Sequence, residues 1–214
     1  MGTVSVTKLG GISLALGPVI ALFFFLIQPG SLLIQPADPA SAQASIAALM
    51  SNSSLTQVSA LFIPIGLIMF LYGANTLQSS ITGNGSALSG WGTLFLMFAV
   101  ITVLISSSMQ ALIAGGSTGT AVGAVYAIGL GISTTGSIIL GLGFLFLFLG
   151  ISTNDSFNKK LAYVAVVTAI VHTVVSIIGA TDSAQLQTMQ QISGLCYVIV
   201  TVYAIILGRS MISR

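Results

Sequence analysis

The sequence predicts an all-α integral membrane protein, a polytopic bundle of six transmembrane helices with both termini in the cytoplasm and a short external helix after the first span. Three observations support this fold class. Hydrophobic residues make up 55% of the 214 residues and charged residues only 4%, whereas soluble domains carry about 25% charged residues. The apolar residues form long runs separated by short polar segments. The few basic residues all lie in alternate polar segments, which is the pattern of polytopic membrane proteins.

Six apolar segments account for the spans of a single transmembrane domain over residues 1–214. A helix needs roughly 20 mostly apolar residues to cross a hydrocarbon core of about 30 Å. The segments that meet or approach this length are 9–27, 58–77, 91–114, 132–150, 161–180 and 192–207. The fourth belongs to a longer apolar stretch, 120–150, which as a helix measures about 45 Å. Either this helix is strongly tilted, or its first part, 121–131, lies outside the membrane core.

The basic residues determine the predicted orientation. All five lie in the N-terminus, the loops 78–90 and 151–160, or the C-terminus: they are Lys8, Lys159, Lys160, Arg209 and Arg214. Because cytoplasmic loops are enriched in Lys and Arg, we expect these segments in the cytoplasm. An odd number of spans would place Lys8 and Arg209 on opposite sides, so six spans are favoured over five or seven.

The longest loop, 28–57, is predicted to be external and to contain a short helix. Asp38 suits the N-cap position and Pro39 the first helical position, so we expect a helix over residues 40–50. Three apolar residues share one face of it, namely Ile46, Leu49 and Met50. The helix is therefore predicted to lie on the membrane surface or to cap the bundle.

The single histidine is the most informative polar residue within a predicted span. His172 lies in the fifth span, with Thr168 and Ser176 four residues away on either side, so the three share one helix face. Ionisable groups are costly inside a membrane, and they face the bundle interior or a cavity where they occur. The face around His172 is therefore predicted to point inward.

A second polar row follows the third span, where Thr102, Ser106 and Gln110 recur every four residues. In the predicted topology Ser106 and Gln110 reach the same outer depth as His172. Polar residues of the fourth and sixth spans also fall on that side. We therefore expect one outward-opening ligand pocket, lined by His172, Thr168, Ser176, Ser106, Gln110, Tyr126, Cys196 and Tyr197.

Two other interpretations of these polar residues stay open. They can simply hydrogen-bond across helices, at about 0.6 kcal/mol each, or they can relay protons or bind a metal. Soft ligands suit Cu(I), and His172, Cys196 and Met109 are the side chains available for it. One histidine and one cysteine are too few for a thiolate cluster or a bis-histidine haem. We therefore assign no metal site and no catalytic residue, and we expect no cofactor bound by this chain alone.

Enzyme motifs and nucleic-acid-binding patterns are missing from the sequence. It contains no Walker loop, no H-E-x-x-H and no G-x-S-x-G motif, and no carboxylate lies within a predicted span. The five basic residues form no clustered patch of the kind that nucleic-acid binding requires. These absences disfavour an enzyme, although a membrane oxidoreductase subunit stays an alternative.

The layout resembles an uncharacterised prokaryotic family of six-helix membrane proteins, classed as a domain of unknown function. The resemblance rests on the six spans, on Asp38-Pro39 before the short helix, and on residues 140–150, which read LGLGFLFLFLG and precede a short polar loop. It implies the same topology and a location in the cytoplasmic membrane. It implies no catalytic or binding residue.

Two functions are consistent with these features. The first is an accessory or structural subunit of a larger membrane complex, in contact with lipid and with other membrane subunits or further copies of this chain. The second is a small-molecule or lipid-binding membrane protein, or a transporter, that uses the outer pocket around His172.

Overall fold

The computed structural model describes residues 5–155 and 157–213. Within them the chain forms seven α-helices and no strand. Six helices are long and apolar enough to span a membrane: α1 (Val6–Ile27), α3 (Ser53–Ser79), α4 (Asn84–Ala114), α5 (Val122–Ser152), α6 (Lys159–Thr181) and α7 (Leu186–Ile212). The seventh, α2 (Ala42–Ser51), is short. The prediction of a helical membrane bundle with six spans and a short helix after the first is confirmed.

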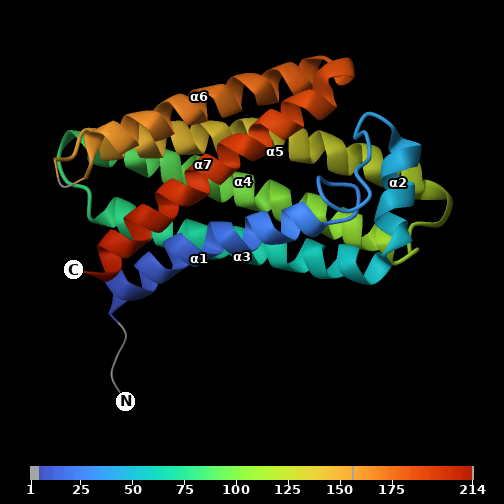
Figure 1. The fold of residues 1–214 in the computed structure, drawn as a ribbon, viewed down its shortest axis with the longest axis horizontal. Coiled ribbons are helices and arrows are strands. Elements are labelled where there is room, and N and C mark those ends of the chain that lie inside the picture. The colour runs from blue at the N-terminus through green and yellow to red at the C-terminus, as the bar shows by residue number, and fades with distance from the viewer. Residues whose placement is uncertain (1–4, 156, 214) are drawn as a thin grey trace.

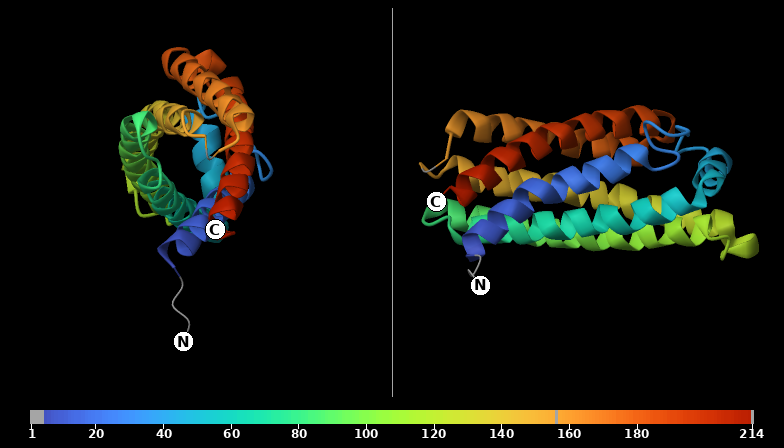
Figure 2. Two further views of the ribbon diagram at one scale, coloured as in Figure 1. Left: turned by 90° about the vertical axis from the view of Figure 1, so that its left-hand side faces the viewer. Right: turned by 60° about the horizontal axis from the view of Figure 1, so that its bottom comes forward.

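The six long helices form a closed ring. Each packs against the next in the order α1, α3, α4, α5, α6 and α7, and α7 returns to α1. Figure 2 shows this ring seen along the bundle, with α2 lying across its distant opening. The ring encloses a central space, and what fills that space differs between its two ends.

The two ends of the ring differ in charge. At one end, which we term the basic end, lie the start of α1, the start of α6 and the end of α7, with the exposed residues Lys8, Lys159, Lys160 and Arg209 (Figure 1). Arg214 lies outside the described residues. At the opposite end, termed the far end, lie α2 and the loops 28–41, 115–118 and 182–185. The cytoplasmic location of the basic end stays a prediction.

The long helices extend beyond the predicted spans. α3 begins at Ser53 rather than at residue 58, because the side chain of Asn52 accepts a hydrogen bond from the main-chain N–H of Leu55 and caps the helix. The long apolar stretch forms one continuous helix, α5, of 31 residues. Residues 122–131 are therefore part of the same helix as the rest of the fourth span.

The predicted start of the short helix is wrong. Ser41, not Asp38, is its N-cap, and the hydroxyl of Ser41 accepts from the N–H of Ala44 at 3.4 Å. Asp38 instead closes a turn, in which its carboxylate accepts from the N–H of Ala40 at 2.9 Å. The buried face also differs from the predicted one, since it consists of Ser45, Ala48 and Leu49. This face packs on α3, α4 and α5, so α2 caps the bundle.

Glycines bring neighbouring helices of the ring into main-chain contact. A Cβ atom added to Gly66 of α3 would lie 2.6 Å from the carbonyl oxygen of Gly17 and 2.6 Å from the main-chain nitrogen of Ala21, both on α1. A Cβ on Gly11 of α1 would lie 2.7 Å from the carbonyl oxygen of Gly208 on α7. Small residues allow this close approach in a bilayer, where packing rather than water exclusion holds helices together.

Aromatic side chains fill the ring toward the basic end. We term Phe70, Phe144, Phe148 and Tyr203 the aromatic floor; all four are buried. Phe144 of α5 meets Phe70 of α3 at 5.9 Å between ring centroids, and Phe148 of α5 meets Tyr203 of α7 at 5.4 Å. Both pairs join helices that are not neighbours in the ring, so these side chains close its centre.

The glycine contact between α1 and α3 predicts a measurable loss of stability. Gly66→Ala should lower the thermal unfolding temperature in detergent, since overpacking a close contact costs about 1–3 kcal/mol. Gly131→Ala is the matched control, because this exposed glycine of α5 has no atom within 4 Å of an added Cβ. It should be neutral or stabilising by up to about 1 kcal/mol. Equal unfolding temperatures for the two variants would contradict the close contact.

Candidate ligand cavity

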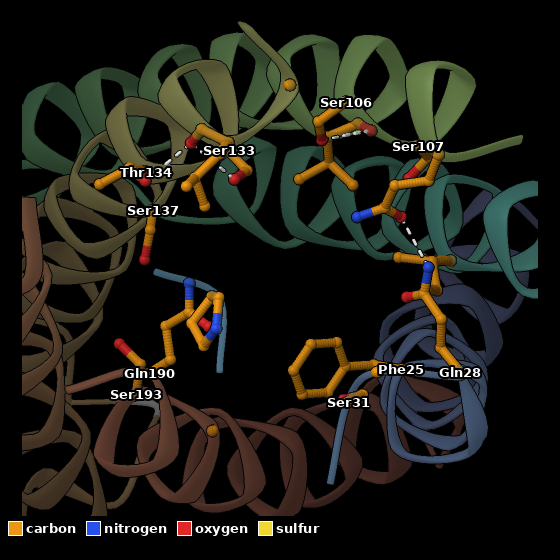
Figure 3. A pocket seen from close by; sticks show the side chains of 18 of the residues that line it. Phe25, Gln28, Ser31, Ser106, Ser107, Ser133, Thr134, Ser137, Gln190 and Ser193 are labelled. Carbon is orange, nitrogen blue, oxygen red and sulfur yellow. Dashed lines mark hydrogen bonds between the residues drawn. The ribbon is translucent and has the colours of Figure 1, made fainter. Parts of the chain in front are cut away.

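A cavity of about 350 Å³ occupies the ring between α2 and the aromatic floor. All seven helices contribute to its lining, together with residues 28–31 and Pro39 of the loop before α2. Figure 3 shows polar side chains from α4, α5 and α7 around the open centre, with Phe25 of α1 projecting into it. The cavity therefore lies in the half of the ring nearer the far end, and Phe144 of the aromatic floor contacts two of its lining residues, His172 and Tyr197.

The lining is mostly apolar, and its polar groups are uncharged. No Asp, Glu, Lys or Arg occurs among the described residues that line the cavity. Its polar groups are hydroxyls, amides and one imidazole, and they alternate with apolar side chains such as Leu67, Val103 and Leu140. A cavity of this kind offers hydrogen bonds and apolar contact but no counter-ion.

His172 lies at the centre of a hydrogen-bonded cluster that joins α5, α6 and α7. Its Nε2 atom is 3.2 Å from the main-chain carbonyl oxygen of Ser137, and its Nδ1 atom is 3.3 Å from the hydroxyl of Ser193. The hydroxyl of Ser176 lies 2.8 Å from that of Ser137 and 3.3 Å from that of Ser193. We term these four residues the serine–histidine cluster.

The contacts of the imidazole are consistent with one tautomer in particular. A main-chain carbonyl only accepts hydrogen bonds, so the 3.2 Å contact with Ser137 favours a proton on Nε2 of His172, although the Ser137 hydroxyl, at 3.4 Å, is also near this atom. Nδ1 is then an acceptor, and the hydroxyl of Ser193 donates to it. The ring is 4% exposed and also meets the edge of Phe144 at 6.2 Å between centroids. Its orientation is therefore fixed from both sides.

Two hydrogen bonds join the far-end loop to the ring. The side-chain amide of Gln28, at the end of α1, donates to the Oε1 atom of Gln110 on α4 at 2.6 Å. The hydroxyl of Tyr126 on α5 donates to the main-chain carbonyl of Pro39 at 2.8 Å. Residues 28–41 and α2 are thereby held over the cavity as its roof.

Six of the eight residues predicted for a pocket line this cavity. They are His172, Ser176, Ser106, Gln110, Tyr126 and Tyr197. Thr168 and Cys196 are buried but do not line it. Thr168 lies one turn nearer the basic end than His172, and its hydroxyl donates to the main-chain carbonyl of Val164 at 2.9 Å.

Several lining residues were not predicted from the sequence. Ser133, Thr134 and Ser137 come from α5, Gln190 and Ser193 from α7, and Gln28 from the end of α1. A signal for two of them exists, since Ser133 and Ser137 stand four residues apart within an apolar run. Isolated serines give a weak signal, because their hydroxyls can donate to the carbonyl of the preceding helical turn.

The lining does not resemble a metal centre. Within the described part of the chain, no three His, Cys, Asp or Glu side chains lie together. Of the three residues weighed for Cu(I), His172 and Met109 line the cavity and Cys196 does not.

Comparison with known proteins gives no relative. No family model matches the chain. No curated protein matches it. No solved structure matches it. The resemblance to a six-helix family stays a prediction, and the function has to be inferred from the chain's own residues.

The tautomer of His172 is testable by nitrogen NMR of isotope-labelled protein, because the chain has only this histidine. We expect a protonated Nε2 and an unprotonated, hydrogen-bonded Nδ1 at neutral pH. Ser193→Ala should shift the Nδ1 resonance toward that of an unbonded imidazole nitrogen, and it should cost about 0.5–1.5 kcal/mol of stability. Ser108→Ala, on the exposed face of α4, should leave both resonances unchanged. A protonated Nδ1 in the unaltered protein would show that the assignment is wrong.

Proposed function

We propose that this protein binds a small, uncharged, amphipathic molecule in the cavity between α2 and the aromatic floor. The observation that supports this most directly is the cavity itself, which all six long helices line with hydroxyl, amide and apolar side chains. Its volume of about 350 Å³ falls at the lower end of the range of ligand pockets, about 300–1,000 Å³.

The chemistry of the lining favours a neutral occupant. An ion that leaves water for a low-dielectric site loses hydration energy, which must be restored by a counter-charge or by ligating groups. The described lining contains no charged side chain. A neutral molecule with a polar group and an apolar part loses much less on transfer, and it matches both kinds of wall.

The closed floor favours binding over passage through the ring. Phe144 is fully buried and contacts Phe70, Phe148 and His172, so the cavity ends at this level. A channel would need a continuous path, and a carrier would need a second state in which the aromatic floor opens. Binding from the far end or from the surrounding lipid requires neither.

Ser193 and His172 also have the arrangement of a nucleophile and its general base. In covalent hydrolases a serine hydroxyl lies within reach of an oriented imidazole in this way. Acyl transfer additionally needs donors for the developing oxyanion. Ser193 lies inside α7, where helical hydrogen bonds occupy the main-chain N–H groups that form such a site in many hydrolases. We therefore propose a binding role and not hydrolysis.

The subunit function expected from the sequence is a second proposal, supported by the small extramembrane mass. One outward-facing feature also supports it. Gly123, Ala127, Gly131 and Thr135 are exposed and recur every four residues along α5, and small residues at this spacing suit close helix contact in bilayers. A mass equal to one chain plus bound lipid, after extraction in native lipid particles, would count against a complex.

Filling the cavity should abolish binding. Ser107 lines the cavity, whereas the adjacent Ser108 is exposed on the outer face of α4. We expect wild-type protein and Ser108→Phe, purified in native lipid particles, to carry the same neutral small molecule by mass spectrometry, and Ser107→Phe to have lost at least nine-tenths of it. An identical set of bound molecules in Ser107→Phe and Ser108→Phe would contradict occupancy of this cavity.

A further inference from the structure

The two sides of the cavity differ in hydrogen-bonding character. On the side formed by α5, α6 and α7, the serine and threonine hydroxyl hydrogens are donated to the protein itself, whereas the hydroxyl of Tyr197 has no partner among the described residues. Ser133 and Thr134 both donate to the main-chain carbonyl of Leu130, at 2.9 and 2.7 Å. The oxygen atoms of these hydroxyls keep lone pairs, so this part of the wall can accept hydrogen bonds.

The serine–histidine cluster extends the accepting side. Once Nε2 of His172 donates to the carbonyl of Ser137 and Ser193 donates to Nδ1, Ser193 accepts from Ser176 and Ser176 accepts from Ser137. Every N–H and O–H of the four side chains is then used within the cluster. What remains for an occupant is lone pairs on hydroxyl oxygens, which require a donor from the ligand.

The opposite side, formed by α4 and the end of α1, offers donors. The Oε1 atom of Gln110 accepts from Gln28, and this leaves the two N–H groups of Gln110 and the second N–H of Gln28 without an acceptor among the described residues. Amide N–H groups only donate. Ser107, beside them on α4, makes no hydrogen bond through its hydroxyl to another described residue. These N–H groups can hold a ligand acceptor such as a carbonyl oxygen, and the Oε1 atom of Gln28 can accept a hydrogen bond as well.

We propose that the occupant is a neutral amphipath whose polar group carries both an N–H or O–H donor and a carbonyl, as a secondary amide or a hydroxy-carbonyl compound does. The donor is directed to the serine–histidine cluster and the carbonyl to Gln110 and Gln28. The apolar part lies against Phe25, Leu67 and Leu140. This inference rests on the proposed function and adds the ligand's chemical class to it.

The size of the cavity limits how much of such a molecule it holds. A volume of about 350 Å³ equals that of about a dozen liquid water molecules at roughly 30 Å³ each. This suits an amide group with a short chain, whereas a whole two-chain lipid would exceed it. A soluble amide and the single-chain amide of a lipid share this chemistry, and probes of different chain length distinguish the two sources.

The test compares probes that differ only in their hydrogen-bonding groups. Radiolabelled N-methyloctanamide has a donor and an acceptor, N,N-dimethyloctanamide has only the acceptor, and methyl octanoate replaces the amide by an ester. Retention is measured on the protein in lipid nanodiscs and corrected with empty nanodiscs. We expect the secondary amide to bind about tenfold more tightly than either acceptor-only probe, which corresponds to about 1.4 kcal/mol. Repeating the series with acetamides and with hexadecanamides distinguishes a soluble from a lipid source.

Variants test which side of the cavity binds the donor of the ligand and which side binds its carbonyl. Ser193→Ala should reduce the tenfold preference for the donor-bearing probe to about twofold or less, and Gln110→Leu should weaken all three carbonyl probes. Ser108→Ala should change neither result. If either cavity variant fails to fold, Ser176→Ala and Ser107→Ala test the same two walls.

The outcomes distinguish failure of this inference about the ligand class from failure of the proposed binding function. If the three octanoyl probes bind equally and Ser107→Phe abolishes their retention, the cavity is a binding site and the donor-and-carbonyl inference is overturned. If no probe of any chain length is retained above empty nanodiscs, the proposed function fails as well. A preference that survives both Ser193→Ala and Ser176→Ala also overturns the assignment of the accepting wall.

Discussion

The structure depends on one constraint: hydrocarbon cannot satisfy polar groups, so polar residues of the spanning helices either face one another or, like Ser108, donate to their own helix. α6 illustrates the result. Its exposed face includes Val164, Val167, Ile170, Val171 and Val174, while Thr168, His172 and Ser176 are buried. Because α4, α5 and α7 each carry polar residues on one inner face, a closed ring is the arrangement in which all of these faces avoid lipid. Glycine contacts such as those of Gly66 and Gly11 let neighbouring helices of the ring approach closely.

A closed ring leaves a central space, and side-chain size decides where that space stays empty. Toward the basic end the inward positions of α5 hold Phe144 and Phe148, which reach α3 and α7 and close the centre. About two to four turns nearer the far end, the inward positions of the same helix hold Gly129, Ser133 and Ser137. These side chains are too small to meet across the ring. The cavity is thus a consequence of the change from Phe to Ser and Gly along α5.

The fold was predictable from sequence because hydropathy identifies the segments that can lie in hydrocarbon, and the fold places these segments side by side. The local details were less predictable. Asp38 and Ser41 are comparable N-caps, and the choice of Ser41 reflects contacts that bring in distant residues, namely Tyr126 to the carbonyl of Pro39 and Ser45 to that of Asp38. The four-residue spacing of polar residues predicted the inner face of the helix around His172. It did not predict how far along that face the cavity extends. Thr168 shares that face and still lies at the level of the packed half, and Ser193 becomes part of the site only because the ring places α7 beside α6.

Access to the cavity and recognition within it involve the same residues. The aromatic floor closes the path from the basic end, so an occupant has to arrive in the half of the ring where residues 28–41 and α2 form the roof. Gln28 and Gln110 hold that roof through their hydrogen bond, and in the proposed binding mode their remaining N–H groups hold the ligand's carbonyl. A bound carbonyl therefore rigidifies the two side chains that keep the roof in place. One pair of amides therefore takes part both in holding residues 28–41 over the cavity and, in the proposed binding mode, in holding the ligand.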